Sequence, residues 1–230
     1  MEMEACLPVA LDRGYRLPVA SRATRPSRPR RRRDGERRRS ELLDAALRCF
    51  ARRGVLGVGI EDIRREAGAS PSSVYNLFAD IDEIILALLV RVFDALFAHI
   101  AARVRRTRTA EGAVRALVDA HMEWIALHPE QGRFMYQAMS LEGAGLRPQA
   151  REQLVAAKAR GLQPILEHVQ PFVERGAIPK WPPALLDVVL LGAAHEALRR
   201  WLAGASELDP AVLRKRLPAL AWKSVRREPG

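Results

Sequence analysis

The side chains best suited to chemistry lie in one short polar segment, residues 70–76, and their types suit contact with nucleic acid. The carboxamide of Asn76 can form two hydrogen bonds with the edge of an adenine. Tyr75 offers a hydroxyl group to a base or a phosphate, although the same side chain can simply pack at the rim of a helical unit. The candidate DNA contacts in this segment are Ser70, Pro71, Ser72, Ser73, Tyr75 and Asn76.

No set of residues is spaced for catalysis or for binding a metal ion. The five histidines do not form an HExxH pair, and the two cysteines do not form a Cys-x-x-Cys pair. The chain also lacks a phosphate-binding glycine loop and a G-x-S-x-G segment. We therefore expect no enzyme activity, no catalytic residue, no metal and no cofactor.

Two short helices joined by a glycine turn are predicted to position the polar segment. Apolar residues recur at i, i+3 and i+7 over residues 60–67, which predicts a helix of two turns. Gly68 permits the positive φ that often ends a helix, and Ser70 can cap the next one. Val74 and either Leu77 or Phe78 then face inward. A helix–turn–helix unit has this division between a buried face and a polar face.

A longer series of residues surrounds this unit in a fixed order and spacing. It comprises residues 42–46, Phe50, Gly54, residues 60–63, residues 67–70, Val74, Tyr75, Phe78 and residues 82–85. This series resembles the DNA-binding segment of TetR-family transcriptional repressors. The resemblance implies an all-α fold, with an N-terminal three-helix DNA-binding domain and a C-terminal helical domain for ligand binding and dimerisation. It also implies a homodimer that binds a palindromic operator in double-stranded DNA until a small-molecule inducer releases it.

Three positions depart from the family pattern. Gly59 stands where the family usually has a helix-capping Thr or Ser, Leu77 where a polar residue is frequent, and Ile81 where many members have a lysine that touches phosphate. We therefore predict that phosphate contacts shift to Arg38, Arg39 and the basic segment before them.

Positive charge is concentrated near the N-terminus. The formal net charge is +11, and residues 22–39 hold ten arginines against Asp34 and Glu36, a local charge of +8. Proline, arginine and serine dominate this region, so we expect residues 1–37 to form a disordered arm. The arm can follow DNA phosphates, or it can be no more than a solvated extension.

The remaining composition predicts a cytoplasmic protein without a membrane partner. Cys6 and Cys49 do not suggest a disulfide framework, and the N-terminal region does not resemble a signal peptide. The apolar run over residues 184–194 contains Asp187 and is too short to span a membrane.

Helical periodicity continues through the rest of the chain and divides it into two domains. Residues 38–84 would form the DNA-binding domain and residues 85–226 the second domain. The expected helices span residues 38–52, 60–67, 81–106, 111–127, 130–141, 148–173, 184–203 and 210–224, besides the short one that begins after Ser70.

The second domain contains residues that suit a pocket for a small, largely apolar ligand. Methionine and aromatic side chains adapt to varied apolar ligands, although such residues are also ordinary core components. The candidates are Trp124, Phe134, Met135, Met139 and Leu162. His121, Glu123 and Arg133 are further candidates to orient a polar group of the ligand.

The last helices carry more apolar side chains than one neighbouring helix can cover. We expect them to form a two-fold dimer interface, with a monomer core as the alternative. The predicted interface residues are Val188, Gly192, His195, Trp201, Leu213 and Leu217. A second functional hypothesis stays open, in which the chain is an architectural DNA-binding protein without a ligand that binds mainly through its arginine-rich arm.

Overall fold

The computed structural model describes residues 29–141 and 148–226, and every regular element in these two ranges is helical. The elements are α1 (Pro29–Arg53), η1 (Val55–Gly57), α2 (Ile60–Glu66), α3 (Pro71–Tyr75), α4 (Ile81–Val104), α5 (Ala110–Leu127), α6 (Pro129–Leu141), α7 (Pro148–Glu174), α8 (Pro183–Leu202), η2 (Ser206–Leu208), α9 (Pro210–Leu213) and α10 (Leu217–Val225). The predicted all-α class is confirmed.

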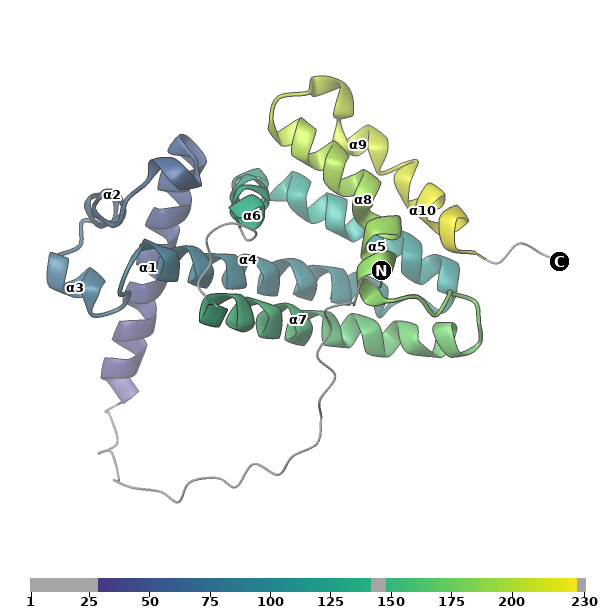
Figure 1. Cartoon of the computed structure of the whole chain (residues 1–230), viewed down its shortest axis with the longest axis horizontal. Helices are drawn as coiled ribbons and strands as arrows, with labels where there is room; N and C mark the ends of the chain where they lie inside the picture. The colour runs from purple at the N-terminus through teal and green to yellow at the C-terminus, as the bar shows by residue number, and fades with distance from the viewer. Residues whose placement is uncertain (1–28, 142–147, 227–230) are drawn as a thin grey trace, which may run out of the picture.

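Helix α4 joins the two parts of the molecule. Figure 1 shows α1, α2 and α3 together at one end and the helices from α5 to α10 toward the other. Between them runs α4, which packs against α1, α5, α6 and α7. By length and composition α4 would also suit a membrane span, but half of its most apolar stretch is buried inside the molecule. Its apolar residues serve as the core of the helical bundle.

Side-chain caps explain where several helices begin. Asp80 accepts a hydrogen bond from the Glu83 amide at 2.9 Å and so caps the start of α4. The Glu83 carboxylate reaches back to the amide of Ala79 at 2.7 Å, one residue before the position expected in a capping box. Thr109 caps α5 in the same way, by accepting from the Gly112 amide at 3.0 Å. These polar groups satisfy amides that have no partner within the helix.

The first helix is longer than predicted, because α1 begins at Pro29 and not at residue 38. Proline suits the first turn of a helix, and arginine is a good helix former, so Gly35 is the weakest position in this run. Seven of the ten arginines, residues 30–33 and 37–39, therefore belong to α1. The predicted arm is wrong for residues 29–37, and its first 28 residues lie outside the described part.

The predicted C-terminal helix over residues 210–224 is two helices. Helix α9 ends at Leu213, and α10 begins at Leu217 with Pro218 in its first turn. A proline at this position cannot donate a hydrogen bond to the carbonyl of Arg214, and its ring would clash with that carbonyl in a continuous helix. The chain therefore turns before Pro218, and α10 starts where the missing N–H has no cost.

Charged side chains hold the α9 end against the bundle. Arg214 donates to Asp119 at 2.8 Å and to Glu123 at 2.8 Å, both on α5. Arg103 of α4 lies 3.1 Å from the same Glu123 carboxylate. The hydrogen bonds from Arg214, mainly to Asp119, outweigh partial burial and raise the pKa of its guanidinium. Glu123 and Asp119 are thus occupied in this network, and Glu123 is not placed to orient a ligand.

Candidate nucleic-acid interface and helix-bundle cavity

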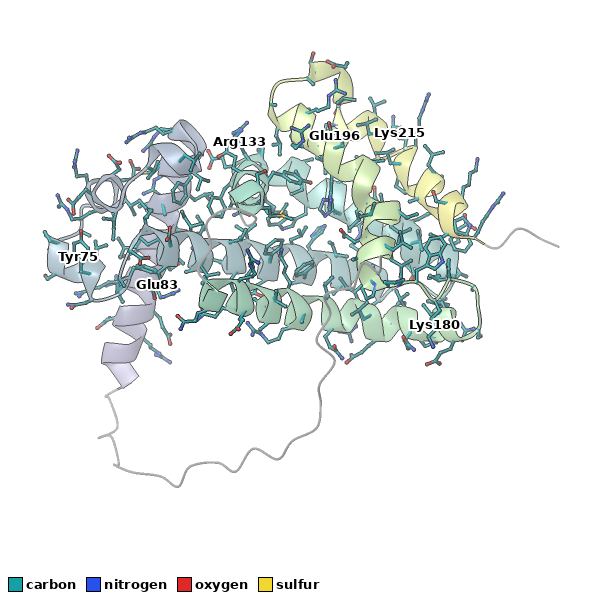
Figure 2. The ribbon with its side chains drawn as sticks, viewed as in Figure 1. Tyr75, Glu83, Arg133, Lys180, Glu196 and Lys215 are labelled. Atoms are coloured by element: carbon teal, nitrogen blue, oxygen red, sulfur yellow. The ribbon has the colours of Figure 1, made fainter. Side chains whose placement is uncertain are left out.

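Helix α3 presents the predicted DNA-contacting residues on its outer face. Val74 and Phe78 are buried, whereas Tyr75 is 52% exposed and Asn76 is exposed. Figure 2 places Tyr75 at the end of the molecule opposite the C-terminal helices. The predicted division between a buried face and a polar face is confirmed. Contact between this face and DNA stays a prediction.

The start of α3 is capped as expected. The Ser70 hydroxyl accepts from the Ser73 amide at 3.3 Å, and Pro71 occupies the first helical position. The same hydroxyl lies 3.2 Å from that of Ser72 and 3.0 Å from that of Ser73. These three serine hydroxyls therefore bond with one another, and the longer side chains of Tyr75 and Asn76 extend beyond them as the more selective groups.

Arginines of α1 form ion pairs with acidic residues of α2. Arg48 lies 2.8 Å from Glu66, Arg52 bonds the other oxygen of the same carboxylate, and Arg53 lies 2.9 Å from Asp62. The hydrogen bonds from Arg48 and Arg52 lower the pKa of Glu66. Several exposed pairs of this kind orient helices more than they stabilise the fold. The helix before the turn is thus fixed on α1.

The i, i+4 spacing of Asp44 and Arg48 suggests an ion pair within α1, but the structure pairs both residues elsewhere. Asp44 lies 2.8 Å from Arg91 of α4, and Arg48 bonds Glu66 of α2. A pair between neighbouring helix turns contributes only a few tenths of a kcal/mol, so partners on other helices readily compete with it. Asp44 consequently ties the DNA-binding unit to α4.

The two predicted phosphate contacts on α1 differ in their surroundings. Arg38 is exposed, whereas the Arg39 guanidinium lies 4.7 Å from the centre of the Phe78 ring. This cation–π contact places Arg39 beside the residues that follow α3. Arg39 therefore braces the helix–turn–helix unit, and Arg38 faces solvent.

Helix α6 touches the DNA-binding unit directly. Phe134 stacks on Phe50 of α1 with a ring separation of 5.3 Å, and the Gln137 side chain accepts a hydrogen bond from the Val55 amide at 3.2 Å. Gly54, just before Val55, has a φ of +75°, which glycine adopts without strain. The prediction that Phe134 lines a ligand pocket is wrong, because its ring is buried against α1.

A cavity of about 310 Å³ lies among α4, α5, α6, α7 and α8. Met135, Met139 and Leu162 line it, so the cavity contains three of the five predicted pocket residues. Trp124 does not, because it is buried beside His128, with ring centres 4.9 Å apart. Most of the lining is apolar, as in many small-molecule sites.

Polar groups gather in one part of this cavity. His121 is 3% exposed, and its Nε2 lies 3.3 Å from the Tyr136 hydroxyl. The His195 ring stands 4.7 Å from the His121 ring and 6.0 Å from the Tyr136 ring, measured between centroids. Burial, and then the neighbouring His195, lowers the pKa of His121 to about 3, so His121 is neutral. Burial also raises the pKa of the Tyr136 hydroxyl.

His195 is therefore misplaced in the predicted dimer interface. Its side chain lines the cavity and contacts two aromatic residues of the same subunit. It is the one histidine of α8, a largely apolar helix, so the residue stands out in the sequence. The sequence pattern does not show which side of α8 faces inward, because both sides carry apolar residues.

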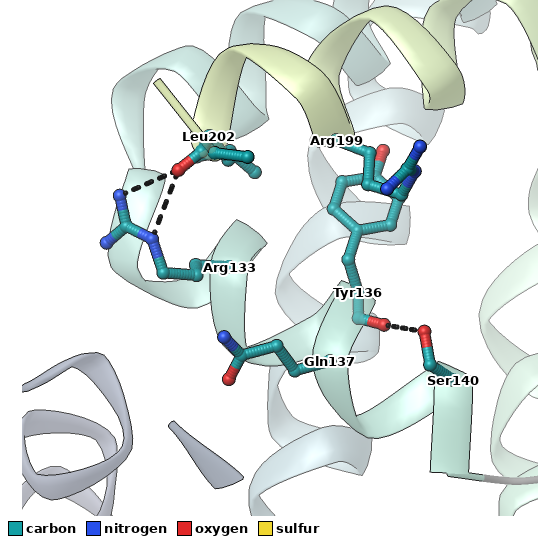
Figure 3. Close-up of a pocket in the computed structure, with 7 residues that line it drawn as sticks. Arg133, Tyr136, Gln137, Ser140, Arg199 and Leu202 are labelled. Carbon is teal, nitrogen blue, oxygen red and sulfur yellow. Dashed lines mark hydrogen bonds between the residues drawn. The ribbon is translucent and has the colours of Figure 1, made fainter. Parts of the chain in front are cut away.

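A second, more polar pocket lies between α6 and the end of α8, and its volume is also about 310 Å³ (Figure 3). Arg133 donates two hydrogen bonds to the Leu202 carbonyl, at 3.2 and 3.4 Å. Gln137 and Tyr136 also line this pocket. Tyr136 thus separates the outer pocket from the inner cavity, and Arg133 is occupied in fixing the end of α8.

The other residues of the predicted dimer interface differ in exposure. Val188 is 66% exposed, and a Cβ at Gly192 would meet no described atom within 4 Å. Trp201, Leu213 and Leu217 are half-buried against the core. Other large apolar side chains exposed on this part of the molecule are Leu185, Val212 and Leu220.

Comparison with known proteins gives local sequence matches. Residues 42–88 match the family model described as bacterial regulatory proteins, tetR family. Over 81 residues, 35% of this chain, the sequence is 36% identical to the HTH-type transcriptional regulator BetI of Brucella anthropi. That alignment spans 42% of the length of BetI.

Solved structures extend the likeness across most of the chain. A TetR family transcription regulator from Marinobacter aquaeolei VT8 gives a TM-score of 0.69 at 21% identity, covering 86% of this chain and all of that one. FadR from Bacillus subtilis, solved in complex with stearoyl-CoA, gives 0.65 at 16% identity, covering 81% of this chain and 99% of that one. The structural neighbours support the fold, and the family-model match covers the helix–turn–helix region. Residues 42–88 thus match the tetR family of bacterial regulatory proteins, and the described chain shares its fold with solved TetR family regulators.

Proposed function

We propose that this protein is a cytoplasmic, sequence-specific DNA-binding repressor that a small, largely apolar ligand releases from a palindromic operator. The observation that carries the DNA-binding role is the outer face of α3, where Tyr75 and Asn76 project from a capped helix. Arginine clamps fix the preceding helix, so the polar face is held in a defined orientation. Preorganisation of this kind suits reading of base edges in the major groove.

A homodimer would supply the second recognition helix that a palindrome requires. Leu185 and Val188 on α8 and Leu220 on α10 are exposed apolar side chains on two helices that pack against each other. Two copies joined through this face bury apolar surface that one copy leaves in water. The two α3 helices would then contact half-sites roughly 34 Å apart.

The cavity and the DNA-binding unit share two helices, which supports regulation by a ligand. Helix α6 lines the cavity with Met135 and Met139 and contacts the DNA-binding unit through Phe134 and Gln137. Helix α4 contributes Phe97 and other residues to the cavity and begins beside α3. A ligand that prefers one arrangement of these helices would change the spacing of the two α3 helices.

The apolar lining of the cavity supports a largely apolar ligand. The structural neighbour FadR was solved with stearoyl-CoA, whose acyl chain is apolar. In this chain Met135, Met139 and Leu162 give the cavity a flexible apolar wall. We propose that the inducer is a molecule with an apolar body that enters this cavity.

An architectural DNA-binding role is the alternative, and the seven arginines at positions 30–33 and 37–39 of α1 favour it. Salt titration distinguishes the two functions. A repressor should keep a large ratio of specific to nonspecific affinity when salt weakens both, whereas binding through the arginines alone should show a ratio near one. The measurement compares an enriched duplex with a scrambled duplex of the same length and composition.

A further inference from the structure

A smaller chamber of about 170 Å³ adjoins the cavity among α4 to α8. The two chambers share walls that include Leu117, Leu162 and Leu191. Apart from Asp187, the described side chains that line the smaller chamber are apolar. The pair of chambers therefore suits a long molecule whose apolar tail fills the smaller one.

Three polar groups from three different helices meet in the larger chamber. His121 comes from α5, Tyr136 from α6 and His195 from α8. The His121 Nε2 and the Tyr136 hydroxyl are 3.3 Å apart, and the His195 ring lies beside both. Hydrogen-bonding groups that converge in an otherwise apolar cavity fix the orientation of a ligand.

The ring nitrogens of His195 are available to hydrogen-bond a ligand. Within residues 29–141 and 148–226, its side chain makes ring contacts with His121 and Tyr136 but no hydrogen bond. In the same residues, no fully buried side-chain nitrogen or oxygen lacks a partner. The ring nitrogens of His195 must therefore face open space, and its side chain lines the cavity. A ligand group at this point would gain a hydrogen bond.

The charged groups on the walls have opposite signs. Among the described residues, Lys158 and Asp187 are the charged side chains that line the two chambers. The Lys158 ammonium lies 4.8 Å from the centre of the Phe93 ring. Asp187 is exposed, as are Pro183 and Ala184 beside it, so the cavity opens to solvent at the first turns of α8. The described charged groups that line the two chambers thus sum to no net charge.

We propose that the inducer is a straight-chain molecule with an uncharged hydrogen-bonding head, a hydroxyl or a carbonyl, which binds among His121, Tyr136 and His195. This inference rests on the ligand role proposed above. The head group exchanges hydrogen bonds with the two imidazoles and the phenol. The apolar tail extends past Leu117 into the smaller chamber.

The energetics exclude an ionised head from this position. Burial keeps His121 neutral, and burial also lowers the pKa of His195 although Asp187 opposes the shift. A carboxylate here would lose its hydration without gaining a cationic partner from either imidazole, which is costly in an apolar site. An ammonium group would find no anionic partner among the three side chains, since the carboxylate whose charge acts on Tyr136 and His195, Asp187, is exposed to solvent at the first turns of α8. An uncharged hydroxyl or carbonyl loses far less hydration and keeps its hydrogen bonds.

The test is direct binding of four probes with a common chain length, namely decanol, 2-decanone, decanoate and decylamine. Isothermal titration with the purified full-length protein at neutral pH gives each affinity. We expect decanol and 2-decanone to bind at least about tenfold more tightly than the two ionised probes, a difference of roughly 1.4 kcal/mol. Operator binding without any probe is measured in parallel, because it tests the DNA-binding function independently.

Two variants locate the head group. Tyr136→Phe removes one hydroxyl and keeps the ring, so it should weaken decanol binding by roughly three- to tenfold, the loss of one hydrogen bond. His195→Leu should do the same. Met139→Leu changes an apolar part of the same wall and serves as the matched control, with affinity for decanol little changed.

Two results would overturn the inference. Tighter binding of decanoate or decylamine would show that the cavity selects an ionised head, and it would leave the repressor function intact. No binding of any probe, by a protein that still binds its operator, would show that the cavity does not take molecules of this class. Loss of operator binding would instead count against the proposed function.

Discussion

At the scale of single residues, Asn76 and Tyr75 are the groups on α3 that best combine exposure with selective hydrogen bonding. Asn76 also ends α3, where its backbone amide bonds back to the helix. The helix end depends on this backbone amide, so the side-chain carboxamide of Asn76 is not needed to cap the helix. The nearby serines bond with one another, so a change at Asn76 probes base recognition more cleanly than a change at Ser72.

Replacing Asn76 with alanine should weaken operator binding by about 1–3 kcal/mol and relax the preference at one base pair of each half-site. Fluorescence anisotropy with duplexes changed at each position measures both effects. Glu130→Ala, on the exposed start of α6, is the control. An unaltered base preference in Asn76→Ala would remove this residue from the interface.

The buried His121 predicts a dependence of stability on pH. Its pKa is about 3 in the folded protein, against an ordinary value near 6.5. Below about pH 6.5 the unfolded chain binds a proton that the folded protein does not, so acidification lowers the unfolding free energy by up to about 1.4 kcal/mol per pH unit. Above that pH the contribution is constant.

Replacing His121 with asparagine should remove most of this dependence, whatever its effect on overall stability. Urea unfolding at several pH values between about 4.5 and 7 measures the slope, which should be shallower than in the wild type. The exposed His128, changed to glutamine, should leave the slope unaltered. Equal slopes in His121→Asn and the wild type would contradict the burial of a neutral imidazole.

At the scale of helices, α6 connects the cavity directly to the DNA-binding unit. Gln137 accepts a hydrogen bond from the Val55 amide, and Val55 itself is buried. Leucine at position 137 would leave that amide without an acceptor. A buried amide that loses its partner costs about 1–3 kcal/mol.

Gln137→Leu should therefore lower the unfolding free energy by about 1 kcal/mol or more, as measured by urea denaturation. Gln137→Glu keeps a carboxyl oxygen in place of the amide oxygen and should recover most of the loss. If the leucine variant is as stable as the wild type, the hydrogen bond does not hold the two parts together.

Helix boundaries could be predicted from the sequence wherever a cap or a breaker marks them. Ser70 marks the start of α3, and the helices expected from residues 81 and 184 begin at Ile81 and Pro183. The start of α1 could not be predicted in this way, because an arginine-rich run suits both a disordered arm and a helix. Periodicity also could not show that Phe134 faces α1 and not the cavity, since it identifies an apolar face without identifying the neighbour.

At the scale of the whole molecule, the cavity could be predicted only in part. Its walls come from five helices that are far apart in the sequence, so helical spacing alone could not bring His121, Tyr136 and His195 together. The methionines indicated where the cavity lies, because flexible apolar side chains adapt to varied apolar ligands. The two-fold interface would form between two copies of the chain. The sequence of one copy indicates only that its last helices carry more apolar side chains than one neighbouring helix can cover.

Charged residues on the exposed apolar face should prevent dimerisation without unfolding the subunit. Val188→Asp combined with Leu220→Asp changes two side chains that are 66% and 53% exposed, so the monomer loses little core packing. Sedimentation velocity should show monomers, and operator affinity should fall because the two half-sites are no longer bound together. Leu56→Asp, at a residue that is 85% exposed on η1, is the control for an added charge. A dimer that persists in the double variant would refute this interface.

The most direct test of sequence-specific DNA binding is selection of sites from random duplex DNA by the purified full-length protein at near-physiological salt. We predict enrichment of a palindrome whose half-sites lie about one helical turn, roughly 34 Å, apart. Tight binding without enrichment of any sequence would contradict this account and favour an architectural protein that binds through the arginines of α1.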